Sequence, residues 1–79
     1  MVIKILGSGC NNCKKLYEMA ADAAKELGIT PELSKVEGMK EIVSYGVMKT
    51  PALVVDEKVK IMGRVPAYNE VLQVLKDAQ

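Results

Sequence analysis

Residues 2–13 run VIKILGSGCNNC, an apolar segment followed by a glycine-rich turn and two cysteines. Val2 to Leu6 predicts a short buried strand, because four of its five side chains are apolar. Cys10-Asn11-Asn12-Cys13 then forms a C-x-x-C motif that uses both cysteines of the chain. Such a motif between a strand and a helix either cycles between dithiol and disulfide or binds a soft metal ion. Most of what the sequence says about function depends on which of these holds.

The apolar period changes after the motif and predicts a helix from Asn11 to Leu27. Charged side chains fill the opposite face, and Gly28 falls where a glycine commonly ends a helix. The positions expected on the buried face are Cys13, Leu16, Tyr17, Ala20, Ala23, Ala24 and Leu27.

A weaker strand is predicted from Ile29 to Val36, and Pro31 near its start favours an edge position in the sheet. A short helix is predicted from Gly38 to Tyr45, ended by Gly46. Its expected buried residues are Met39, Ile42 and Val43.

The last third of the chain predicts two short strands, Ala52–Val55 and Val59–Met62, joined by a hairpin at Asp56-Glu57-Lys58. A final helix follows, ending near Ala78, with Pro66 expected in its first turn. The apolar positions of this helix are Tyr68, Val71, Leu72 and Leu75.

The element order is therefore β-α-β-α-β-β-α. A right-handed β-α-β unit makes the first two strands parallel, and the short hairpin makes the last two antiparallel. We expect an α/β fold over residues 1–79, as one domain, with a mixed four-stranded sheet and helices on both faces.

Composition excludes several classes of function. Eleven basic and ten acidic residues give a net charge of +1, so no strong field favours nucleic acid or a membrane surface. No apolar run approaches the roughly 20 residues of a membrane span, and no secretory signal is expected.

The chain has five Met and no Phe, Trp or His, so we expect methionines to fill the core. Cysteines this close cannot staple a fold, which favours a reducing, cytoplasmic setting.

The two cysteines are expected to differ. Cys10 lies at the predicted start of the first helix, where free N–H groups and the helix dipole stabilise a thiolate. Cys13 lies one turn later on the buried face. An exposed attacking thiol followed by a sheltered one suits a dithiol exchange cycle.

Thr50-Pro51 precedes the predicted third strand. From the residues alone a trans bond is expected, because only about 5–6% of bonds to proline are cis.

Together these pieces resemble the thioredoxin/glutaredoxin superfamily, and more closely the small glutaredoxin-like thioredoxins of prokaryotes. The resemblance covers nearly the whole chain. It is carried by Gly9 to Cys13, by Thr50-Pro51, by Asp56-Glu57-Lys58 and by Ile61-Met62-Gly63-Arg64.

The resemblance implies a thioredoxin-like fold and a thiol–disulfide oxidoreductase in which Cys10 attacks and Cys13 resolves. It implies a cis Thr50–Pro51 bond, with Thr50, Pro51 and Gly63 binding the substrate. No cofactor beyond the cysteine pair is implied. Partners would be proteins that carry disulfides and an upstream reductase, and a monomer is expected. Asn11-Asn12 replaces the residues usual in thioredoxins and glutaredoxins, and the glutathione-binding set is incomplete, which favours protein disulfides as substrates.

Nearby positive charges have two interpretations each. Lys14, Lys15 and Lys49 either place charge near the thiolate or are solvated surface residues. Arg64 either faces the same groove or covers the last helix.

The main alternative to a disulfide-exchange function is a soft-metal carrier domain, which binds Cu(I) or Zn(II) through both thiolates. Such domains usually have Met two residues before the first cysteine, where this chain has Ser8. They run β-α-β-β-α-β and lack a Thr-Pro before a strand. An iron–sulfur cluster shared between two chains is a third alternative.

Overall fold

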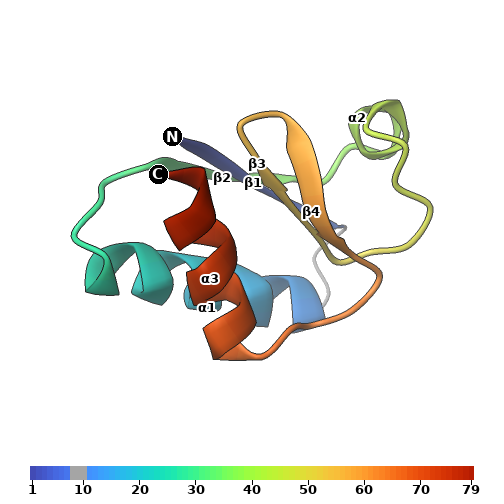
Figure 1. Cartoon of the computed structure of the whole chain (residues 1–79). Helices are drawn as coiled ribbons and strands as arrows, with labels where there is room; N and C mark the ends of the chain where they lie inside the picture. Colours follow the sequence, from blue (N-terminus) through green and yellow to red (C-terminus); the bar gives the residue numbers. More distant parts are fainter. Residues whose placement is uncertain (8–10) are drawn as a thin grey trace.

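A computed structural model describes residues 1–7 and 11–79 and has the predicted order of elements (Figure 1). The elements are β1 (Val2–Leu6), α1 (Asn11–Glu26), β2 (Glu32–Val36), α2 (Met39–Ser44), β3 (Ala52–Val55), β4 (Lys58–Met62) and α3 (Tyr68–Ala78).

The four strands form one mixed sheet in the order β2-β1-β3-β4. β1 pairs in parallel with β2 and antiparallel with β3, and β3 pairs antiparallel with β4. These pairings confirm the predicted directions, and β2 lies at an edge. Because β1 and β2 are parallel, their carboxyl ends meet at one end of the sheet. There the Gly7 N–H donates to the Val36 carbonyl at 2.9 Å.

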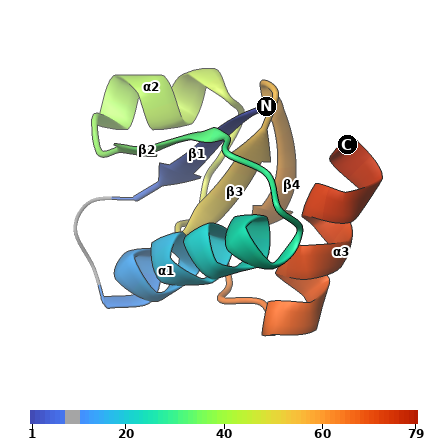
Figure 2. The same cartoon turned by 90° about the vertical axis from the view of Figure 1, so that its left-hand side faces the viewer.

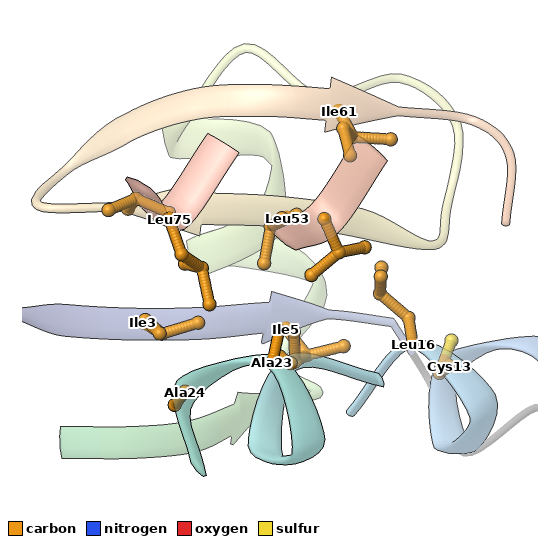
Figure 3. Close-up of a cluster of buried hydrophobic side chains, with 12 residues drawn as sticks. Ile3, Ile5, Cys13, Leu16, Ala23, Ala24, Leu53, Ile61 and Leu75 are labelled. Carbon is orange, nitrogen blue, oxygen red and sulfur yellow. The ribbon is translucent and has the colours of Figure 1, made fainter. Parts of the chain in front are cut away.

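Helices cover both faces of the sheet, as predicted. α1 and α3 lie on one face and α2 lies on the other (Figures 1 and 2). The larger cluster of buried side chains fills the space between the sheet and α1 and α3 (Figure 3). A smaller cluster under α2 contains Leu6, Val36, Ile42, Val47, Ala52 and Val54.

The α1 helix buries the stripe that its period predicts, with Tyr17 and Leu27 only partly covered. The fully buried members are Cys13, Leu16, Ala20, Ala23 and Ala24. Gly28 has a φ of +72°, and the Ile29 N–H returns to the Ala24 carbonyl at 3.0 Å, a typical helix ending. No helix in the described ranges is long and apolar enough to cross a membrane.

Several predicted boundaries were wrong by one to three residues, and three of them have a clear physical reason. β2 begins at Glu32, after Pro31, because proline has no N–H to give to a ladder. β4 begins at Lys58, because Asp56 and Glu57 have φ values of 49° and 69° and form the turn by themselves. α3 begins at Tyr68 with Ala67 as its N-cap, so Pro66 precedes the helix.

The prediction that methionines fill the core was also wrong for three of them. Met39, Met48 and Met62 are 68%, 86% and 50% exposed, and Val43, predicted as buried, is 55% exposed. The α2 helix has six residues and buries only Ile42. A helix of fewer than two turns presents one side chain to the sheet and leaves the others to solvent.

Candidate functional site

Cys13 occupies the first turn of α1 and is 5% exposed. Figure 3 shows its sulfur next to Leu16, at the margin of the larger cluster. The predicted sheltered position is confirmed. Cys10, together with Ser8 and Gly9, lies outside the described residues.

Gly7, directly after β1, brings its backbone against Cys13. A Cβ on residue 7 would lie 2.0 Å from the Cys13 Sγ and 3.7 Å from the Thr50 Cβ. Only glycine permits so close an approach. Gly7 therefore marks the point where the end of β1, the start of α1 and the loop before β3 meet. Gly7 was not predicted as a site residue, although its position between a strand and a C-x-x-C motif was a signal for this role.

The loop before β3 is tied to the segment after β4. The Thr50–Pro51 bond is cis, and the Pro51 carbonyl accepts a hydrogen bond from the Gly63 N–H at 2.9 Å. Gly63 has a φ of +78°, and a Cβ there would lie 3.1 Å from the Lys49 Cβ. The structure thus brings Lys49, Thr50, Pro51 and Gly63 together at the end of the sheet where Cys13 lies.

A recess of about 230 Å³ opens beside Cys13. Its charged members are Lys14, Lys35 and Glu37, and the Lys35 Nζ also lies 4.9 Å from the centre of the Tyr17 ring. The full lining is Ile5, Gly7, Asn11, Cys13, Lys14, Lys35 and Glu37. We call this the charged recess. Lys35 and Glu37 were missed from the sequence, because the predicted parallel pairing of β1 with β2 does not tell which side chains at the end of β2 line a recess beside Cys13.

Arg64 pairs with Glu70 at the start of α3. The Arg64 Nη1 donates to the Glu70 Oε1 at 2.9 Å, and Nη2 pairs with Oε2. This hydrogen-bonded pair lowers the pKa of Glu70 and raises the pKa of Arg64. Of the two interpretations of Arg64, the contact matches the one in which it covers the last helix.

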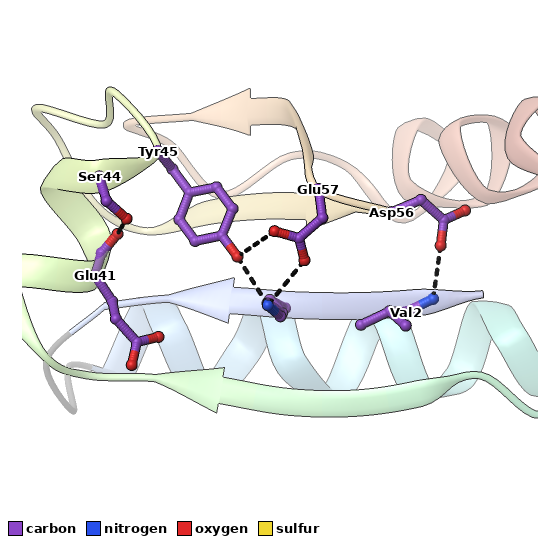
Figure 4. A network of polar contacts seen from close by, with 7 residues as sticks. Val2, Glu41, Ser44, Tyr45, Asp56 and Glu57 are labelled. Carbon is purple, nitrogen blue, oxygen red and sulfur yellow. Dashed lines mark hydrogen bonds and ion pairs between the residues drawn. The ribbon is translucent and has the colours of Figure 1, made fainter.

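A polar triangle braces the other face of β1. The Lys4 Nζ donates to the Tyr45 Oη at 2.8 Å and to the Glu57 Oε1 at 2.9 Å, and the Tyr45 hydroxyl donates to the Glu57 Oε2 at 2.9 Å. Figure 4 shows Tyr45 and Glu57 converging from the end of α2 and the β3–β4 turn. The hydrogen bond with Glu57, above all, raises the pKa of Lys4, and the same bond lowers the pKa of Glu57.

Within residues 1–7 and 11–79 no buried polar or charged side chain occurs. The same residues contain no cluster of three or more His, Cys, Asp or Glu that could hold a metal ion.

Comparison with known proteins agrees with this arrangement. The family model of the thioredoxin domain matches residues 1–76. A thioredoxin of Methanothermobacter thermautotrophicus is 44% identical over 75 residues, which cover 95% of this chain and 97% of that protein. A thioredoxin of Methanocaldococcus jannaschii is 37% identical over 76 residues, covering 96% of this chain and 87% of that protein. A probable thioredoxin of Archaeoglobus fulgidus is 34% identical over 70 residues, covering 85% and 76%. With Cys13, Gly7 and the Thr50–Pro51 loop gathered at one end of the sheet, the chain belongs to the thioredoxin domain family.

Proposed function

We propose that this chain, as one thioredoxin-like domain over residues 1–79, reduces disulfides in proteins by a two-cysteine exchange. The observation that carries the proposal is the position of Cys13. It is buried on the first turn of α1, against Gly7, three residues after the other cysteine of the chain. A sheltered thiol at this distance suits an intramolecular second step, whereas two equally exposed thiols would suit a metal clamp.

The exchange cycle has two chemical steps. The Cys10 thiolate attacks one sulfur of a substrate disulfide, whose S–S bond breaks, and the released thiolate takes a proton from water. The Cys13 thiol then loses its proton and attacks the Cys10 sulfur, which expels the second substrate thiolate. The substrate gains two electrons and two protons, and the enzyme keeps a Cys10–Cys13 disulfide. A separate reductase that donates two electrons restores the dithiol.

Other residues have supporting roles in this proposal. Thr50, Pro51 and Gly63 contact the substrate segment around its disulfide, since Thr50 lies close to Gly7 and the Gly63 N–H binds the Pro51 carbonyl. Lys49, whose side chain lies along Gly63, adds positive charge near the departing thiolates. Arg64 does not contact the substrate in this proposal. It binds Glu70 and thereby fixes the start of α3. The cysteine pair carries the electrons itself, so the cycle needs no cofactor, and a reducing, cytoplasmic compartment suits it.

Insulin reduction by the dithiol form is the direct assay. We expect turnover well above that of dithiothreitol alone, and equal rates would contradict the proposal. Cys13→Ser should trap a mixed disulfide through Cys10, and Cys10→Ser should trap none. Trapping through Cys13 would reverse the two roles. Stoichiometric Cu(I) or Zn(II) in the purified protein would favour the metal-carrier alternative, from which this chain differs in the order of its elements.

A further inference from the structure

Three apolar side chains beside Thr50 are exposed although the domain is small. Met39 and Val43 on α2 are 68% and 55% exposed, and Met48 on the following loop is 86% exposed. Single exposed apolar residues are normal, but several together on one surface commonly mark a site of interaction.

These side chains line a recess of about 260 Å³ together with Ile42, Val47 and Thr50. We call it the α2 recess. None of its six lining residues is charged. Its volume lies below the roughly 300–1,000 Å³ of pockets that hold small-molecule ligands. The α2 recess therefore fits one bulky side chain better than a cofactor.

Thr50 connects the α2 recess to the reactive end of the sheet. A Cβ on Gly7 would lie 3.7 Å from the Thr50 Cβ and 2.0 Å from the Cys13 Sγ. The charged recess, with Lys14, Lys35 and Glu37, includes Cys13 itself. A substrate disulfide near Cys13 thus has an apolar surface on one side and a charged surface on the other.

We propose that the α2 recess receives a bulky apolar side chain that flanks the reactive cysteine in a protein substrate. This inference rests on the proposed function and adds a preference for one class of substrate sequence. The methionines suit the role, since an unbranched, polarizable thioether adapts to apolar side chains of different shapes.

A second copy of the chain fits the α2 recess less well. A stable protein–protein interface buries about 1,200–2,000 Å² in total, which three exposed side chains around one small recess cannot supply. A short segment needs less surface, because the mixed disulfide with Cys10 holds it in place covalently.

The kinetic test compares two peptide disulfides that differ only in the residues flanking cysteine, leucine in one and lysine in the other. Bis(2-hydroxyethyl) disulfide, which has no flanking residue, serves as the reference substrate. The double variant Met39→Gln/Met48→Gln alters the α2 recess. Met62→Gln is the matched control, because Met62 is also exposed but lies on β4 and is not in the lining.

We expect the wild type to reduce the leucine peptide with about tenfold higher kcat/KM, the lower end of what one apolar group contributes to selectivity. The double variant should keep only about twofold preference, through a higher KM at unchanged kcat. Met62→Gln should behave as wild type, and all proteins should reduce the reference substrate equally. Absence of a preference in the wild type, its persistence in the double variant, or an equal loss in Met62→Gln would overturn the inference.

A binding measurement separates this inference from the proposed function. At a peptide concentration high enough to compensate for the missing covalent link, a leucine peptide with serine in place of cysteine should shift the methyl NMR signals of Met39 and Met48 and leave that of Met62 unchanged. Such shifts in a protein that reduces no disulfide would support the α2 recess and refute the proposed function. A protein that reduces disulfides but shows no such shifts would support the proposed function and refute the role of the α2 recess. Shifts that depend on protein concentration without peptide would identify a second copy as the occupant and overturn the inference.

Discussion

Gly7 and Cys13 are in such close contact that a methyl group on residue 7 would lie 2.0 Å from the Cys13 Sγ. Since Cys13 is buried, its side chain has little room to move away. We expect Gly7→Ala to lower the free energy of unfolding by about 1–3 kcal/mol, as overpacking does, and to slow insulin reduction by displacing the sulfur.

Gly38→Ala is the control for this substitution, because a Cβ there meets nothing within 4 Å and Gly38 has an ordinary φ of −70°. It should change the free energy of unfolding by at most about 1 kcal/mol, the effect of altering an N-cap. Urea unfolding and the insulin assay measure both variants. Equal stability of Gly7→Ala and wild type would contradict the contact.

Alanine substitutions at Gly63 and Gly46 can distinguish the effect of backbone strain on stability from an effect on the geometry of the site. Both have positive φ, +78° and +76°, but only Gly63 donates to the Pro51 carbonyl and has a neighbour, Lys49, within reach of an added Cβ. Each substitution to alanine should cost about 1–2 kcal/mol of stability, because an L-residue disfavours this conformation. Only Gly63→Ala should also lower kcat/KM for peptide disulfides. An equal kinetic loss in Gly46→Ala would indicate a general effect of instability.

The charged recess predicts opposite effects of two neutralising substitutions on Cys13. A nearby cation favours the thiolate and a nearby carboxylate disfavours it. In a Cys10→Ser background, Lys35→Gln should therefore raise the pKa of the Cys13 thiol and Glu37→Gln should lower it. Thiolate absorbance at 240 nm against pH measures both. Lys60→Gln, on β4 outside this lining, should leave the titration unchanged, and shifts of the same sign in both test variants would contradict the prediction.

Much of the fold was predictable because it depends on local patterns. The buried face of α1 follows from its helical period over 16 residues, and the parallel pairing of β1 and β2 follows from the handedness of β-α-β units. Cys13 was placed on the buried face by the same period. Such patterns are reliable over long elements, because several apolar positions independently indicate the same buried face.

The misses have a different physical origin. α2 is too short for its period to decide which apolar residues face the sheet, so Met39 and Val43 were placed in the core. Lys35 and Glu37 reach Cys13 only through tertiary pairing. Lys4 interrupts an apolar strand, and its partner Glu57 lies 53 residues away. A sequence pattern can predict that two strands pair, but it does not tell which side chains from distant segments come into contact.

The Lys4–Glu57 contact predicts how stability depends on pH. Its hydrogen bond lowers the pKa of Glu57 from 4.5 and raises that of Lys4 from 10.5. The stabilisation from Glu57 is thus present above pH 4.5 and lost as the pH falls further. The stabilisation from Lys4 is present below pH 10.5 and lost as the pH rises further. We expect the urea midpoint of the wild type to be nearly constant between about pH 6 and 9 and to fall outside these limits.

Glu57→Gln should lower the urea midpoint between pH 6 and 9 and make its decrease at acid and alkaline pH smaller. The substitution removes the charge while the backbone of the turn stays the same. Glu41→Gln is the control, because Glu41 is exposed on α2 and its carboxylate has no ion pair in the described structure. A pH profile of Glu57→Gln that parallels the wild type would show that the triangle contributes nothing to stability.

Leu53 and Met48 provide a contrast between a buried and an exposed apolar residue. Leu53 is fully buried on β3, opposite Ile5, whereas Met48 lines the α2 recess and is almost fully exposed. Leu53→Ala should cost about 2–5 kcal/mol, the usual cost of a cavity in a core, and Met48→Ala at most about 0.5 kcal/mol. A domain of this size has roughly 4–12 kcal/mol of stability, so the first change should shift the urea midpoint strongly. If Met48→Ala were instead as costly as Leu53→Ala, Met48 would belong to the core, and the α2 recess would be closed in solution.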